Sequence, residues 1–302
     1  MLEATYEVPY LAHATMEPQN STARFTDDGI CEIWSPNQGP DVVQALVAEA
    51  LDMPRSKIVV HTTLLGGGFG RRGIPDFAVD AAEIARQVEK PVKVIWSREE
   101  DTQHDYYRPA TWNVMKAGLD QHGVVQTWQH KLVAPSMTHS LLPKFGTLAP
   151  EWMPDWLVNA LIGGAGAWIK TRDSSTVEGA EQLPYRIPNI DIRHVYYDPG
   201  VPLGFWRSVG HSQNAFITES FIDELAHKAG TDPCEFRRRL LGDNHPRHLA
   251  VLDLVAGKSN WGKAGVSQGI AVHESFGSVV AEVVDITVVN GKPRIERITC
   301  AV

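Results

Sequence analysis

Residues 66–73 read Gly-Gly-Gly-Phe-Gly-Arg-Arg-Gly and stand between a predicted strand and a predicted helix. The apolar stretch Lys57–Leu65 precedes this loop, and the helical pattern Phe77–Val88 follows it. Glycine accepts positive φ and leaves its backbone N–H uncovered, and the start of a helix adds the positive end of its dipole. We therefore expect the loop to receive an anion or an oxyanion close to the main chain.

The same loop contains the spacing GxGxxG at Gly68, Gly70 and Gly73, which also occurs in dinucleotide-binding domains. Val92–Trp96 is typical of the strand that would come next, and Glu99 lies near the position of a ribose-binding acid. In a Rossmann domain, however, this loop is the first strand-to-helix turn, whereas here roughly fifty residues of other structure precede it. A nicotinamide-dependent dehydrogenase and a tight turn without a ligand both stay open.

Outward from the loop, strand and helix patterns follow one another without an internal repeat. Asp232 and Pro233 form a helix start, because aspartate caps the first turn and proline suits its first position. The predicted helices and strands are Val42–Leu51, Asn214–Lys228, Pro233–Leu241 and Leu249–Val255, and Leu2–Val8, Asn113–Leu119, Val124–Val133, Ser278–Val289 and Arg294–Val302. This mixture favours an α+β fold with helices packed on mixed sheets, in two subdomains.

The sequence divides into three parts. Residues 1–134 form an N-terminal subdomain that contains the glycine loop, and residues 189–302 form a second part with helices and a sheet that breaks off at its end. Between them, residues 135–188 are rich in Pro, Gly and Trp and are expected to be irregular. Such a segment is either a flap over a site or a packing surface, and Trp152–Trp168 would then be the docking surface of a noncatalytic assembly module.

Composition excludes several classes of protein. With 302 residues, 43% of them hydrophobic, the chain can bury a substantial core, and its net charge of -8 argues against nucleic-acid binding. The run 237–239, Arg-Arg-Arg, is interpreted as the solvated face of a short helix. Cys31, Cys234 and Cys300 are too scattered for a disulfide framework or an iron–sulfur cluster, so any cluster must belong to a partner.

No targeting segment or membrane-spanning run is recognisable in the sequence, so we expect a soluble chain. Its abrupt strand-like beginning and end are typical of a piece of a longer polypeptide.

Four separated segments resemble the large, molybdenum-binding subunit of the xanthine oxidase/aldehyde oxidase family. Two of the strings, GGGFGRR and GFWRSVGHSQNAF, look most like the β subunit of isoquinoline 1-oxidoreductase and related membrane-associated aldehyde dehydrogenases. The resemblance implies a fold like that of a molybdopterin-binding domain. The segments are Leu11–Pro18, Gly66–Arg72, Ile187–Asn189 and Leu203–Gly210.

The resemblance also implies which residues hold the cofactor. Phe69 and Gly70 would lie beside the molybdenum, with Gly67 and Gly68 in the same loop, and a backbone amide would face a metal ligand. Gln38 would donate from its side-chain amide to an oxo group, although a loop glutamine before a helix is the simpler interpretation.

Arg207 matches an arginine whose backbone amide approaches the metal. Its alternative is a structural ion pair with Asp198 or Glu219.

Other polar residues carry less weight. Glu17 lies in one of the matching segments, and His13 precedes it by four residues, but Pro9 and Pro18 bracket too short a run for a helical zinc pair. His211 could face a substrate, although a lone histidine is more often structural. His245 and His248 are interpreted as part of a polar loop, and no resident metal-ligand set is predicted.

By resemblance, the whole protein would be a molybdenum hydroxylase that oxidises an aldehyde or an N-heteroaromatic small molecule with oxygen from water. The cofactor would be molybdenum with molybdopterin, in its cytosine dinucleotide form, and electrons would pass to iron–sulfur clusters on a partner subunit. The family's general-base glutamate segment is absent, so the catalytic residue is unknown here and is expected beyond Val302. We expect this chain alone to be inactive without the remaining parts of the subunit, and the full-length protein to be periplasmic or membrane-associated.

Overall fold

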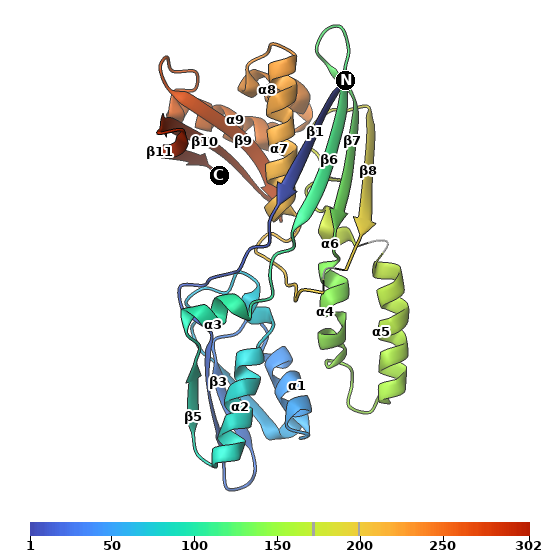
Figure 1. The fold of residues 1–302 in the computed structure, drawn as a ribbon, viewed down its shortest axis with the longest axis vertical. Coiled ribbons are helices and arrows are strands. Elements are labelled where there is room, and N and C mark those ends of the chain that lie inside the picture. Colours follow the sequence, from blue (N-terminus) through green and yellow to red (C-terminus); the bar gives the residue numbers. More distant parts are fainter. Residues whose placement is uncertain (171–172, 199) are drawn as a thin grey trace.

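The computed structural model describes residues 1–170, 173–198 and 200–302. Two hydrophobic cores lie toward opposite ends of an elongated molecule, and loops join them near its middle (Figure 1). The fold is a mixture of helices and mixed sheets, which confirms the predicted α+β class.

The first core lies between a four-stranded sheet and two helices. The sheet order is β4-β3-β2-β5, in which β3 and β4 are parallel and β2 is antiparallel to both of its neighbours. Helices α1 and α2 cover it with small apolar residues, and the short helix α3 follows β5 (Figure 1). The bounds are β2 Asn20–Phe25, β3 Cys31–Ser35, α1 Pro40–Ala50, β4 Ile58–Thr62, α2 Asp76–Val88, β5 Val92–Ile95 and α3 Arg98–Gln103.

This topology shows that the dinucleotide interpretation is wrong. In a Rossmann unit the strand before the glycine loop pairs with the strand after the helix. Here β3 and β2 separate β4 from β5, and the loop ends in a 3-10 turn at Arg71–Gly73 before α2 begins.

The second core unites the two ends of the chain. One sheet has the order β1-β6-β7-β8 and packs on α7, where Trp128 contacts Phe221 at a ring-centroid distance of 5.2 Å. A second sheet, β11-β10-β9, packs on α9. The bounds are β1 Leu2–Val8, β6 Thr111–Leu119, β7 Val125–Ala134, β8 Asn189–Tyr196, α7 His211–Lys228, α8 Pro233–Leu241, α9 Pro246–Ser259, β9 Ser267–Ser275, β10 Ser278–Val289 and β11 Lys292–Ala301.

Most helices and strands that have a clear start, end or periodic pattern in the sequence lie where the sequence analysis predicts them. Helix α8 begins at Pro233, and the Asp232 carboxylate accepts hydrogen bonds from the amides of Cys234 and Glu235 at 2.9 and 3.0 Å. Strand β9 was not predicted.

The prediction that residues 135–188 are irregular is wrong, because the described residues of this segment form three helices. Ser136 caps the first of these, and the second follows Pro154. Two of their glycines allow close packing of the two helices: a β-carbon on Gly146 would lie 2.2 Å from the Ile162 side chain, and one on Gly166 would lie 3.1 Å from the His139 ring. The helices are α4 Met137–Gly146, α5 Asp155–Ile169 and α6 Ser174–Val177, and residues 171–172 of this segment lie outside the described part.

The three-part division of the chain stays a prediction. Strand β7 comes directly before the helical segment 135–188 in the sequence, and β8 comes directly after it. The two strands pair in parallel, so the chain leaves and re-enters the same sheet (Figure 1).

The interpretation of Arg237 as part of a solvated face is also wrong. Its side chain is fully buried and forms ion pairs with Glu219 at 2.9 Å and Asp223 at 2.5 Å, since the helix turns this arginine toward α7. Only Arg238 and Arg239 reach solvent.

No helix within residues 1–170, 173–198 and 200–302 combines the length and apolar character that a membrane crossing needs.

Candidate cofactor site

The glycine loop turns outward after β4 in a sharp bend at Phe69 and Gly70. Phe69 has φ 54° and Gly70 has φ 110°, and Phe69 is 39% exposed. The Gly70 backbone amide donates to the Gln38 side-chain oxygen at 3.1 Å, and the backbone amide of Gln38 donates to the Arg72 carbonyl at 3.0 Å. The bend is therefore exposed, and Gln38 lies directly against it.

The glycines are required by the chain's own neighbours. A β-carbon on Gly68 would lie 2.5 Å from the Gln38 side-chain oxygen, and one on Gly70 would lie 1.7 Å from the Phe205 carbonyl oxygen. Gly67 has φ 100°, which disfavours any other residue. The missing side chains thus let two other segments approach the loop.

The second of these segments contains Arg207 and is strained. Ser208 and Val209 have φ 71° and 50°, and a β-branched residue rarely adopts this conformation. Backbone strain of this kind is concentrated at functional sites, where the surrounding structure maintains it.

The two segments face one another across an open cleft of about 440 Å³. It brings together four of the predicted residues, Gln38, Phe69, Gly70 and Arg207, whereas Gly67 and Gly68 do not line it. The lining residues are Gln38, Phe69, Gly70, Phe205, Trp206, Arg207, Ser208, Val209 and Phe276.

The lining offers hydrogen-bond donors and no carboxylate. In the part of the chain that the structure describes, the backbone amide of Phe69 donates to no protein acceptor. Because the Gln38 oxygen already accepts from Gly70, the NH₂ group of Gln38 is the part of its amide left to donate. This donor set suits an anionic or oxo-bearing ligand.

The ion pair suggested for Arg207 with Glu219 is wrong. Glu219 instead accepts from Arg237 at 2.9 Å and from the Tyr185 hydroxyl at 2.6 Å. Across the described residues Arg207 forms no ion pair, with Asp198 or any other carboxylate, and its side chain is exposed at the cleft.

Glu17 does not line the cleft but connects the segments that form it. Its carboxylate accepts from the Gly66 amide at 2.8 Å and pairs with the buried Arg72 at 2.9 Å. Partial burial alone would raise the pKa of Glu17, but hydrogen bonds from Gly66 and Asn20 and the charge of Arg72 lower it. Arg72 also donates to the Pro36 carbonyl at 2.9 Å, so this pair links three segments of the site.

The histidines are structural in their immediate contacts. His211 Nδ1 lies 2.8 Å from His273 Nε2, and neither residue lines the cleft. Burial lowers the pKa of His273 to about 4, and His211 adds to this effect. His248 is buried on α9 rather than in a polar loop, with His245 against its ring. Within the described ranges no group of three or more His, Cys, Asp or Glu residues could hold a metal ion.

Sequence reasoning missed Phe276, which reaches the cleft from the turn between β9 and β10. No sequence signal marks it, because it comes from the other end of the chain.

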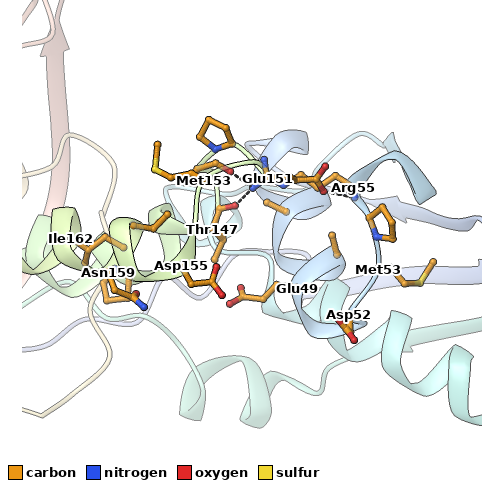
Figure 2. Close-up of a pocket in the computed structure, with 18 residues that line it drawn as sticks. Glu49, Asp52, Met53, Arg55, Thr147, Glu151, Met153, Asp155, Asn159 and Ile162 are labelled. Atoms are coloured by element: carbon orange, nitrogen blue, oxygen red, sulfur yellow. Dashed lines mark hydrogen bonds between the residues drawn. The ribbon is translucent and has the colours of Figure 1, made fainter.

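A larger cavity, of about 710 Å³, lies between α1 and the hairpin of α4 and α5 and contains none of the predicted site residues. In Figure 2 the carboxylates of Glu49 and Asp155 face each other there, and Arg55 donates to the carbonyls of Thr147 and Ala149. Volume alone would have pointed to this cavity, but its lining carries the carboxylates of Glu49, Asp52, Glu151 and Asp155, which disfavour an anionic ligand, whereas the smaller cleft has none.

Comparison with known proteins gives consistent results. A family model described as the molybdopterin cofactor-binding domain matches residues 1–142 and 158–241. Isoquinoline 1-oxidoreductase subunit beta of Brevundimonas diminuta is 32% identical over 257 residues, which cover 85% of this chain and 30% of that protein. The membrane-bound aldehyde dehydrogenase (pyrroloquinoline-quinone) of Gluconacetobacter polyoxogenes is 28% identical over 286 residues, which cover 90% of this chain and 35% of that protein.

Among solved structures, quinoline 2-oxidoreductase from Pseudomonas putida 86 superimposes with a TM-score of 0.69 at 17% identity, covering 90% of this chain and 35% of that chain. This similarity shows a shared fold. The chain spans about a third of the length of these proteins.

Proposed function

Because the chain belongs to the molybdopterin cofactor-binding domain family, we propose that it is part of the molybdenum-binding subunit of an oxidoreductase. The reaction is the hydroxylation of an aldehyde or an N-heteroaromatic compound, the substrate types named in the two relatives. The observation that carries this proposal is the meeting of Gln38, the Phe69-Gly70 bend and Arg207 at one open cleft.

The residues at the cleft fit a molybdenum cofactor. Gln38 presents an uncharged NH₂ donor, and the Phe69 amide adds a fixed backbone donor beside it. Donors that are held in place before the ligand arrives stabilise negative charge without reorganising. Arg207, which forms no ion pair among the described residues, adds a positive charge on the opposite wall.

When bound, the molybdenum cofactor would supply a two-electron oxidation with oxygen taken from water. The chain's own residues would orient it: Gln38 and the bend from one side, the Arg207 segment from the other. Trp206 and Phe276 add aromatic surface to the lining of the cleft.

The rest of the assembly is part of the same proposal. Electrons would leave to an iron–sulfur partner subunit, the cofactor would be the cytosine dinucleotide form, and the general base would come from another part of the large subunit. We place the full-length protein in the periplasm or at a membrane, in line with the name of one relative.

The proposal is tested by producing the full-length polypeptide with its partner and measuring molybdenum per protein and dye-linked oxidation of aldehydes and N-heteroaromatics. Gln38→Glu keeps the size of the side chain but replaces its NH₂ donor with a negative charge, so molybdenum content and turnover should both fall. Gln87→Glu makes the same change on the exposed face of α2 and should change neither. Equal behaviour of the two variants would contradict the assignment.

The same preparation decides the alternatives. Saturable NAD binding without molybdenum would favour a nicotinamide enzyme, although the sheet order opposes it. Binding of the partner without molybdenum or turnover would favour a noncatalytic assembly module, for which the exposed Trp152 and Trp156 offer a surface.

A further inference from the structure

His13 lies in the segment between β1 and β2 and is only 4% exposed, and its backbone amide and both ring nitrogens are engaged. Its backbone amide donates to an Asp105 carboxylate oxygen, and its Nδ1 lies 3.1 Å from both oxygens of that carboxylate. Its Nε2 lies 3.0 Å from the Phe205 carbonyl oxygen. Both ring nitrogens therefore face acceptors, and neither is available for a metal or a substrate.

The ring of His13 also supports one wall of the cleft. It stacks on Trp206 at a centroid distance of 4.8 Å and an interplanar angle of 21°. Phe205 and Trp206 come directly before Arg207, so one side chain contacts two consecutive residues of that wall.

Asp105 connects the same histidine to the opposite wall. It is 2% exposed, and Arg71 Nε lies 3.0 Å from its carboxylate. Arg71 follows Gly70 directly and is itself fixed by Asp76 at 2.9 Å. Contacts thus run without a break from the bend, through Arg71, Asp105 and His13, to Phe205.

We propose that His13 is a positioning residue that sets the Phe205–Arg207 wall at its working distance from the Phe69-Gly70 bend. The inference deepens the proposed function, since the cleft it shapes is the proposed cofactor site, but the geometry it predicts can be measured without cofactor. His13 does not line the cleft, so its effect must act through the wall.

Two conservative substitutions test the contacts of the two ring nitrogens separately. In His13→Gln the amide nitrogen can reach the Nε2 position and keep the hydrogen bond to Phe205. In His13→Asn the shorter amide can replace Nδ1 toward Asp105 but cannot reach Phe205.

The test is hydrogen–deuterium exchange of segment 203–210 in the full-length protein, with molybdenum content measured on the same samples. Positioning by His13 predicts that His13→Asn speeds exchange in this segment about tenfold, the effect of losing one buried hydrogen bond, while His13→Gln stays near wild type. Unchanged exchange in His13→Asn, or equal changes in both variants, would overturn the proposal.

If His13→Asn does not fold, Trp206→Leu provides an independent variant, because it removes the stacked ring from the half-exposed side and leaves both imidazole hydrogen bonds. It should also speed exchange in 203–210, and wild-type exchange there would overturn the proposal. If the variants change exchange as expected but the full-length protein never contains molybdenum, the proposed function is refuted and the positioning role of His13 is kept.

Discussion

Replacing Gly70 with alanine should separate the two walls of the cleft. The new β-carbon would lie 1.7 Å from the Phe205 carbonyl oxygen, whereas real contacts of this kind essentially never fall below 3.0 Å. The backbone cannot relieve the clash by rotating freely, because φ at this position is 110°, a conformation that alanine resists. The Phe205 segment must therefore move away and weaken its hydrogen bond with His13.

The cost can be worked from these two effects. A non-glycine residue in a sparsely populated φ region costs about 1–3 kcal/mol, and forcing a methyl group into a filled position costs about 1–3 kcal/mol more. We expect Gly70→Ala to lower the free energy of unfolding by about 2–6 kcal/mol.

Urea denaturation of the 302-residue chain, followed by circular dichroism, measures this loss. Gly73→Ala is the matched control three residues away, since a β-carbon there meets nothing within 4 Å and no positive φ is required. The control should lie between neutral and about 1 kcal/mol more stable. Equal midpoints for the two variants would refute the interlocked arrangement of the loops.

Two further predictions concern the second core. Burial lowers the pKa of His130 to about 4, so the unfolded chain binds a proton more readily and stability that is present above pH 6.5 is lost as the pH falls toward 4. His130→Gln can keep the hydrogen bond to Asn113 but cannot take up a proton, so the loss of stability between pH 7 and 4, about 3 kcal/mol from this group, should disappear. Denaturation curves across this pH range measure the change, and a stability of the variant that falls as steeply as that of wild type would contradict the prediction. Arg237→Met leaves the Glu219 carboxylate buried without its charge partner and should cost about 3–5 kcal/mol in urea denaturation. The exposed Arg238→Met should cost less than about 1 kcal/mol, and comparable losses in the two arginine variants would show that burial of the pair does not matter.

Elements with local signals were predictable from the sequence. The cap at Asp232 and the proline after it define the start of α8, and the alternation in Ser278–Val289 defines β10 over its full length. The same rules fail for α4 and α5, because they treat Pro and Gly as helix breakers. There proline precedes the first turn of α5, and glycines such as Gly146 let two helices pack closely.

The site was predictable as a set of residues and not as a geometry. The resemblance supplied Gln38, Phe69, Gly70 and Arg207, and the structure brings them to one cleft. The contacts that hold the cleft join residues far apart in sequence, as between His13 and Phe205, 192 positions away. Such contacts depend on tertiary packing, which no local pattern encodes.

Placement of the metal is the most direct test of the central claim. Anomalous diffraction at the molybdenum edge, from crystals of the full-length protein, should give a peak in the cleft between Gln38 and Arg207, beside the Phe69-Gly70 bend. A peak in the larger cavity between α1 and α5, or anywhere else away from that bend, would contradict it.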